Sequence, residues 1–136
     1  MDGGRLRPSS VLRIAAFWLP DEVIVYIGLG GTSVASRVSA YYGTPLGAKR
    51  PHAGGWFLKM LEPDDLQRLY VHFAAAQDPD GAEDDMLRRF CSQVSKQTLA
   101  RLPDPEHPFP FANLEWPRGV RKAHGITGAR GLLRPA

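Results

Sequence analysis

The chain has 136 residues, which is enough for one domain with a single core but too few for two. Its apolar content of 43% excludes a disordered chain, and its one cysteine, Cys91, excludes a disulfide framework and a zinc-finger ligand set. The net charge of +3 permits nucleic-acid binding without requiring it. The start lacks a signal-peptide pattern and no apolar run is long enough for a bilayer, so we expect a cytoplasmic protein without membrane contact.

The first half of the chain is predicted to contain two strands and two helices. The apolar run 11–19, interrupted only by Arg13, predicts a central strand. A second strand over 22–28 follows a very short turn and is therefore expected to pair antiparallel to the first. A glycine-rich turn then leads into a predicted helix over 33–42, and the segment 55–61 predicts a short apolar helix.

The second half adds one strand and one long helix. Alternating apolar residues within 66–76 predict the third strand, and a helical apolar stripe predicts a helix over roughly 81–100. The order β-β-α-α-β-α predicts an α+β fold in which helices flank a small three-stranded mixed or antiparallel sheet. We expect this domain to span 11–116, after a flexible N-terminus at 1–10 and before a basic tail at 117–136.

One face of the helix predicted at 33–42 carries candidate functional groups. Ser33, Arg37 and Tyr41 recur at helical spacing, and no acidic residue lies within a turn of Arg37 to pair with it. A guanidinium presents a fixed fork of donors that matches phosphate oxygens. In a phosphodiesterase, Arg37 would hold the scissile phosphate and Tyr41 would hydrogen-bond one of its oxygens.

Glu83 has two interpretations at the start of the predicted long helix. The sequence Asp80-Gly-Ala-Glu83 matches a capping-box pattern, in which the glutamate would only satisfy backbone groups. Glu83 also precedes Met86 and Leu87 by one turn and so borders the apolar stripe of the helix. A carboxylate at such an edge suits a hard cation such as Mg²⁺ or Mn²⁺.

The glycines after the second predicted strand invite a nucleotide-binding interpretation. The run Gly28-Leu-Gly-Gly31 follows a strand and precedes a helix, as in dinucleotide-binding loops. Ser33 occupies the last glycine position of that pattern, however, and no acidic residue follows at the expected place in a parallel strand. We therefore disfavour a nucleotide site here.

The arrangement of these groups resembles the GIY-YIG nuclease domain, the module of UvrC-type repair nucleases and of some homing and restriction endonucleases. The tripeptide Tyr26-Ile27-Gly28 ends the second predicted strand, as in that family. Arg37 and Tyr41 stand where the family has an arginine on its first helix and a tyrosine or histidine one turn later. These matches imply a divalent-metal-dependent endonuclease that hydrolyses phosphodiester bonds in DNA.

Two further motifs extend the resemblance towards the C-terminus. The family's catalytic glutamate, which is commonly followed by an apolar pair, corresponds to Glu83. A Pro-x-x-Asn motif of the family corresponds to Pro110-Phe-Ala-Asn113. The resemblance implies that Glu83 binds one Mg²⁺ or Mn²⁺ and that Asn113 supports the site.

The chain departs from the family at its first motif. The family's Gly-Ile-Tyr corresponds most closely to Ala15-Ala16-Phe17, and Phe17 has no hydroxyl for proton chemistry. The family often has a lysine after the second motif, where this chain has Leu29. The general base is therefore left open between Tyr26 and His52.

Basic residues outside the motifs are predicted to contact the DNA. Lys49 and Arg50 in the loop before His52, and Arg121 and Lys122 near the C-terminus, would follow the phosphate backbone. With no second domain to select a target, we expect a homodimer or a targeting partner protein. The alternative function is a catalytically degenerate DNA-binding module that acts with a partner, and Phe17 is the residue that favours it.

Overall fold

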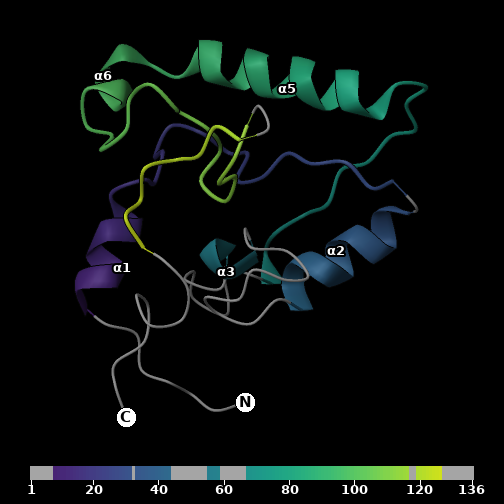
Figure 1. Cartoon of the computed structure of the whole chain (residues 1–136), viewed down its shortest axis with the longest axis horizontal. Helices are drawn as coiled ribbons and strands as arrows, with labels where there is room; N and C mark the ends of the chain where they lie inside the picture. The colour runs from purple at the N-terminus through teal and green to yellow at the C-terminus, as the bar shows by residue number, and fades with distance from the viewer. Residues whose placement is uncertain (1–7, 32, 44–54, 59–66, 117–118, 127–136) are drawn as a thin grey trace.

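The structure is a computed structural model that describes residues 8–31, 33–43, 55–58, 67–116 and 119–126. Helices in these parts of the chain are α1 (Pro8–Ala15), α2 (Val34–Gly43), α3 (Gly55–Leu58), α5 (Pro79–Gln93) and α6 (Lys96–Leu99). Helices α5 and α6 lie along one side of the molecule, with α1 and α2 apart from each other on the opposite side (Figure 1). The segment between α1 and α2 runs beneath α5, and α2 packs against α3.

The predicted three-stranded α+β fold is wrong for the described part of the chain. Residues 22–30 and 69–76 follow paths without helix, but no strand is assigned in the described ranges, which contain only an isolated antiparallel bridge between Glu115 and Arg121. Backbone hydrogen-bonding groups of the second predicted strand are bonded to partners outside any sheet. Val25 O accepts a hydrogen bond from Ala112 N–H at 2.8 Å, and the Asn113 side chain takes both backbone groups of Ile27. A ladder would need these same groups.

The third predicted strand, within 66–76, is also absent from the described residues. Residues 69–76 form neither helix nor strand, and Tyr70 is 87% exposed and Phe73 is 76% exposed. Alternating apolar residues indicate an extended chain, but only a paired neighbour makes that chain a strand. Residues 59–66 lie outside the described residues, so the end of the helix predicted over 55–61 is not seen.

The first predicted strand, over 11–19, is instead largely the helix α1 and the turn after it. The buried side chains of Ser10, Ile14 and Phe17 recur at helical spacing, so a single face of the segment enters the core. Pro8 stands at the first helical position, where its missing N–H costs nothing. The helix therefore begins inside the stretch 1–10 that was expected to be flexible.

The long helix predicted over 81–100 is two helices. Asp78 caps the start of α5, where its side chain accepts a hydrogen bond from Gly81 N–H at 3.1 Å. The chain leaves helical geometry at Val94, and Ser95 caps α6 by accepting from Thr98 N–H at 3.1 Å. A serine that can satisfy a new helix start explains the break in an otherwise continuous pattern.

The cap at Asp78 makes a quantitative prediction. We expect Asp78→Ala to lower the free energy of unfolding by about 1 kcal/mol, because one orphan N–H loses its acceptor. Asp85→Ala is the matched control, since Asp85 forms only an exposed ion pair with Arg88 at 3.8 Å. Urea denaturation followed by circular dichroism measures both, and equal midpoints for the two variants would contradict the cap.

The core gathers side chains from all parts of the described chain. Its most buried members include Ile14, Phe57, Leu87, Phe111 and Ala112. The C-terminal segment 119–126 contributes as well, because Lys122 and Ile126 are buried. The prediction of a separate basic tail from 117 onwards is therefore wrong for 119–126, which belongs to the domain.

Across the described residues, none of the helices is both long enough and apolar enough to cross a membrane.

Candidate functional site

The face of α2 that carries Arg37 and Tyr41 points towards the protein. Tyr41 is buried, whereas Val34 and Tyr42 on another face are exposed. The helix thus turns its more polar stripe inwards, and Arg37 is half-buried as a result. Helical spacing alone identified the stripe, but not the side of the helix that would be covered.

Arg37 and Tyr41 both contact Tyr26. The rings of Tyr26 and Tyr41 are tilted against each other with centroids 4.1 Å apart, and Arg37 Nη2 donates a long hydrogen bond of 3.4 Å to Tyr26 Oη. Tyr41 Oη donates to Ala112 O at 2.8 Å. The Tyr41 ring therefore packs against the Tyr26 ring, and the Tyr41 hydroxyl is held in place by the backbone carbonyl of Ala112.

Gly28 explains why a glycine follows Tyr26 so closely. The Tyr26 side chain folds back over Gly28, and a Cβ at that position would overlap the phenol oxygen and the ring carbons next to it. Any larger residue would push the Tyr26 hydroxyl away from Arg37. The glycine of the tripeptide thus makes room for a side chain at the site.

Arg37 has an unused hydrogen-bond donor. Its Nε is buried and has no hydrogen-bond partner within the described part of the structure. A buried donor left without an acceptor costs roughly 1–3 kcal/mol. A bound anion that accepted from the guanidinium fork would remove this cost, which makes Arg37 the strongest candidate for a phosphate contact.

Glu83 on α5 completes the cluster. The capping interpretation does not apply, because Asp78 caps the helix and Glu83 lies in the second turn. Burial raises the pKa of Glu83, while a backbone hydrogen bond from Leu29 and the charge of Arg37 lower it in part. Tyr26, Arg37 and Glu83 thus interact electrostatically with one another.

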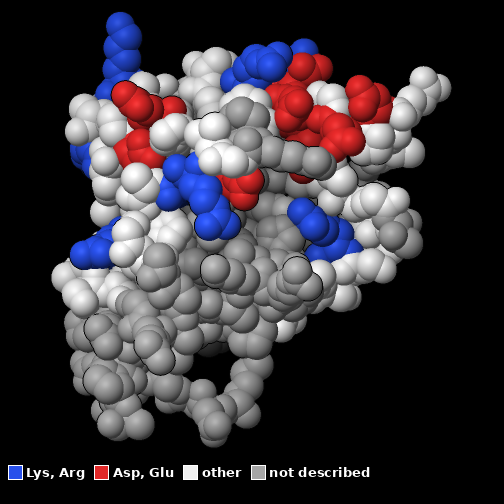
Figure 2. Space-filling model, in the orientation of Figure 1, with Lys and Arg blue, Asp and Glu red and all other residues white. Residues whose placement is uncertain are grey.

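Two other acidic side chains of α5 have partners of their own. Acidic residues gather over the N-terminal half of the helix (Figure 2). Asp84 accepts a hydrogen bond from Trp116 Nε1 at 2.7 Å, and Asp85 pairs with Arg88 on the exposed face. Glu83 is therefore the carboxylate of this acidic stretch whose pKa, raised by burial, is lowered in part by the charge of Arg37.

Tyr26 is a neutral phenol at physiological pH. Burial raises its pKa, and the neighbouring Arg37 offsets part of that rise. Burial likewise raises the pKa of Tyr41. Both hydroxyls therefore serve as hydrogen-bond donors and acceptors, and Tyr26 is better suited to orienting a water molecule than to removing its proton.

Asn113 supports the site from behind. Its Nδ2 donates to Ile27 O at 2.8 Å, and its Oδ1 accepts from Ile27 N–H at 2.9 Å. Both polar atoms of the side chain bond Ile27, and Asn113 is 6% exposed, so the side chain does not face solvent. In this structure Asn113 fixes the backbone next to Tyr26.

The remaining predicted residues lie elsewhere or are not described. Lys49, Arg50 and His52 fall outside the described residues, so neither the predicted DNA contacts nor the second candidate base is seen. Arg121 is exposed and lies 3.7 Å from Glu115, which leaves it accessible to a ligand. Lys122 is 3% exposed, so the prediction that it contacts DNA phosphates is wrong in this structure.

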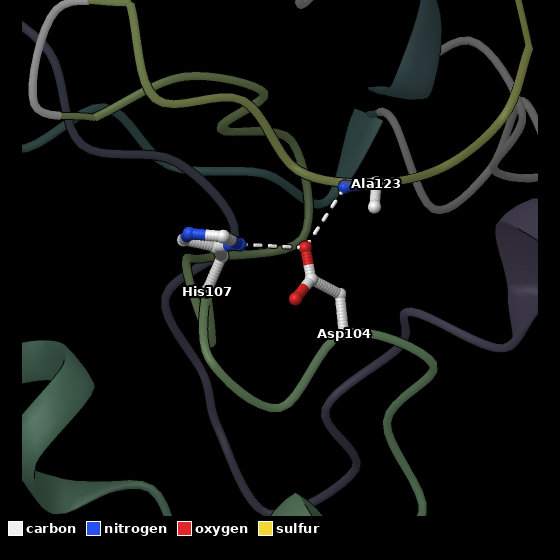
Figure 3. Close-up of polar contacts among 3 residues, drawn as sticks. All are labelled: Asp104, His107 and Ala123. Carbon is white, nitrogen blue, oxygen red and sulfur yellow. Dashed lines mark hydrogen bonds and ion pairs between the residues drawn. The ribbon is translucent and has the colours of Figure 1, made fainter.

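Sequence reasoning missed the polar cluster around Lys122. Asp104 Oδ2 accepts from Ala123 N–H at 2.9 Å and lies 2.7 Å from His107 Nδ1 (Figure 3). Burial opposes ionisation of Asp104, but the bonds from Ala123 and His107 outweigh it and lower the pKa of that carboxyl. Three residues separated in this way form no recognisable motif, so the sequence carried no signal for them.

Lys122 makes the stability of the protein depend on pH. Burial lowers the pKa of Lys122 to about 7, although Asp104 and Cys91 raise it in part. The unfolded chain, with a lysine pKa near 10.5, binds more protons between these two values, so stability rises with pH above 7. We expect a gain on the order of 2 kcal/mol between pH 7 and pH 9.

Urea denaturation at pH 7 and pH 9 tests this in a Cys91→Ala background. That background is needed because burial raises the pKa of Cys91, so thiol ionisation in the unfolded chain would act in the opposite direction. Adding Lys122→Met should abolish the gain. A pH-independent midpoint in the Cys91→Ala protein would show that Lys122 keeps an ordinary pKa.

The described residues contain no group of three or more His, Cys, Asp and Glu side chains that could hold a metal ion by themselves. Comparisons of the whole chain with protein-family models, curated proteins and solved structures found no match. The site is therefore interpreted from its own geometry.

Proposed function

We propose that this protein is a divalent-metal-dependent endonuclease that hydrolyses phosphodiester bonds in DNA. One observation carries the proposal. The Tyr26 hydroxyl, the Arg37 guanidinium with its unpartnered Nε and the Glu83 carboxylate act on one another across α2, α5 and the segment between α1 and α2. A half-buried cation that contacts a phenol and acts electrostatically on a carboxylate suits a phosphodiester, which brings a negative charge and several acceptor oxygens.

Arg37 would bind the scissile phosphate. Its Nη2 already reaches Tyr26 Oη, and its unpartnered Nε–H provides a further donor for a phosphate oxygen. As negative charge builds up on the oxygens during attack, the guanidinium stabilises it without having to reorganise. The Arg37 side chain would thus bind the transition state more tightly than the substrate.

Glu83 fits a hard divalent cation as a single carboxylate ligand. Mg²⁺ is commonly held by one or two carboxylates together with waters and substrate phosphate oxygens, so a larger protein ligand set is not needed. Burial raises the pKa of Glu83, and the backbone hydrogen bond from Leu29 and the charge of Arg37 oppose this rise; a bound cation would favour the carboxylate further. A bound cation would supply Lewis-acid stabilisation of the leaving oxygen.

Tyr26 would orient the attacking water. Its side chain packs against the ring of Tyr41 and over Gly28, and its hydroxyl accepts a hydrogen bond from Arg37. A neutral phenol in this position accepts a hydrogen bond from water and donates one to phosphate. His52 remains the other candidate for the base.

The family assignment is a narrower proposal. The motifs around Tyr26, Arg37, Glu83 and Asn113 resemble those of GIY-YIG nucleases, and this resemblance supports nuclease chemistry. The three-stranded sheet that it implied is contradicted, so the proposal rests on the side-chain cluster. A homodimer or a targeting partner stays a prediction.

A non-catalytic DNA-binding module is the second candidate, and one observation favours it. Phe17, which stands at the position of the first motif's tyrosine, is buried in the core and lies 5.5 Å from Lys122 Nζ. It therefore contributes packing in place of a second hydroxyl. Such a protein would bind DNA through Arg37 without cutting it.

A plasmid-nicking assay distinguishes the two functions. We expect the wild type to convert supercoiled DNA to the open circle with Mg²⁺ and not with EDTA. Glu83→Gln should reduce the cleavage rate by about 10²-fold or more, since the neutral amide binds Mg²⁺ poorly. Asp85→Asn on the exposed face of α5 is the matched control and should cleave like the wild type. DNA binding by the wild type with no Mg²⁺-dependent nicking would reject the enzyme and support the binding module.

A further inference from the structure

Lys122 has a defined set of partners inside the protein. Its Nζ donates to Pro110 O at 3.1 Å and to Phe111 O at 3.0 Å. The rings of Phe17 and Phe57 enclose the amine, with centroids 5.5 and 5.7 Å away. An amine in this position holds two consecutive carbonyls in one orientation.

The backbone of Lys122 is held independently of its side chain. Lys122 N–H donates to Leu114 O at 2.8 Å, and the next residue, Ala123, donates to Asp104 (Figure 3). The lysine is thus anchored to the chain on both sides. The position of its backbone is therefore fixed while its amine bonds the turn 110–113.

The turn 110–113 carries the groups that position Tyr26. Ala112 N–H donates to Val25 O, on the residue before Tyr26, and Asn113 takes both backbone groups of Ile27, on the residue after it. Ala112 O also accepts the hydroxyl of Tyr41, whose ring packs on Tyr26. Residues 110–113 thus hold Tyr26 through both of its neighbours and through its ring partner.

We propose that Lys122 is a positioning residue for the Tyr26–Arg37–Glu83 site, because its amine fixes the Pro110 and Phe111 carbonyls and thereby the turn that holds Tyr26. Loss of the amine frees the turn and lets the Tyr26 hydroxyl move relative to Arg37. The effect on cleavage rests on the proposed function. The effect on the turn does not, and this makes the two separable.

The test replaces Lys122 with methionine, which keeps the length and the apolar stem but removes the amine. Amide hydrogen exchange is followed by NMR at Ala112 and Ile27, whose N–H groups bond Val25 and Asn113. We expect exchange about tenfold faster or more at these two amides, while amides in the middle of α5 keep their wild-type rates. Arg101→Met is the matched control, since it removes a cation from an exposed position to which no role at the site is assigned.

Cleavage gives the second readout. We expect kcat of Lys122→Met for plasmid nicking to fall about 10- to 100-fold with little change in KM, because misplacement of Tyr26 affects the reaction more than DNA binding. The thermal midpoint should fall, because the buried Pro110 and Phe111 carbonyls lose their donor. A lysine with only a structural role would lower the midpoint but leave kcat at the wild-type value at temperatures where the variant is folded.

A chemical rescue keeps the test decisive if the methionine variant does not fold. Lys122→Cys in a Cys91→Ala background is alkylated while unfolded and then refolded. Bromoethylamine restores an amine at nearly the original length, whereas bromopropane gives the same length without one. Slow exchange at Ala112 and Ile27 should return only with the amine.

The outcomes separate the two proposals. Unchanged exchange at Ala112 and Ile27 in Lys122→Met, or an equal rescue by both alkylating agents, overturns the positioning role. Faster exchange in a protein whose wild type does not cleave DNA supports the positioning of the turn and rejects the proposed enzyme.

Discussion

Asn113→Leu is expected to lower the free energy of unfolding by roughly 2–6 kcal/mol. The substitution keeps the branched shape of the side chain but leaves Ile27 N–H and Ile27 O without partners in a buried position. Each unsatisfied buried group costs roughly 1–3 kcal/mol, and the two costs add because no other described group is bonded to them. This is a large part of the total stability of a single domain.

Urea denaturation followed by tryptophan fluorescence measures the loss. Gln97→Leu on α6 is the control, since it makes the same kind of change at an exposed position and should shift the midpoint little. If Asn113→Leu and Gln97→Leu unfold at the same urea concentration, the side chain of Asn113 does not hold the Ile27 backbone.

Arg37→Met is expected to reduce the rate of DNA cleavage by about 10²- to 10³-fold without loss of stability. The substitution removes the guanidinium that would bind the phosphate, and it also removes the buried Nε that lacks a partner. The thermal midpoint should therefore stay the same or rise while the activity falls. Such opposite changes are expected of a functional residue that is imperfectly satisfied in the free protein.

Two comparison variants sharpen this prediction. Arg88→Met removes an exposed arginine from α5 and should leave cleavage at the wild-type rate. Arg37→Lys keeps the charge but loses the fork of donors, so it should restore only part of the activity. Full activity in Arg37→Met would place phosphate binding elsewhere on the molecule.

Local sequence patterns predicted the parts of the molecule that depend on one element at a time. The helix predicted over 33–42 is confirmed as α2, and the spacing of Arg37 and Tyr41 correctly placed both on one face. The long helix was also correct in its first part, because Leu87, Phe90 and Val94 form a buried stripe. Periodicity works here because each helix buries a single face.

The sheet was predicted wrongly because its pairing depends on distant residues. The run 11–19 is apolar nearly throughout, so a strand and a buried helix were hard to distinguish by pattern. The 22–28 segment forms neither helix nor strand, and Ala112 and Asn113 bond backbone groups of Val25 and Ile27. No local pattern shows that an asparagine 86 positions away will take the place of a neighbouring strand.

Only part of the site could be predicted from the sequence, because some of its contacts also depend on distant residues. Tyr26, Arg37 and Glu83 were singled out by residue type and position; in the structure Arg37 hydrogen-bonds Tyr26, and burial raises the pKa of Glu83, which the charge of Arg37 lowers in part. Lys122 was assigned to the surface because it lies in a basic, glycine-containing stretch, yet two carbonyls and two rings make its burial possible. Burial of a charged residue depends on partners that are assembled only in the fold.

The rate of plasmid nicking by the double variant Arg37→Met/Glu83→Gln tests the central claim most directly, namely that Tyr26, Arg37 and Glu83 form a single phosphodiesterase site. Groups that act as a unit in one transition state are strongly non-additive. We expect the double variant to cleave no more slowly than the slower of the two single variants. Losses that multiply, or a wild type that leaves the plasmid intact in Mg²⁺, would contradict a single catalytic site at these residues.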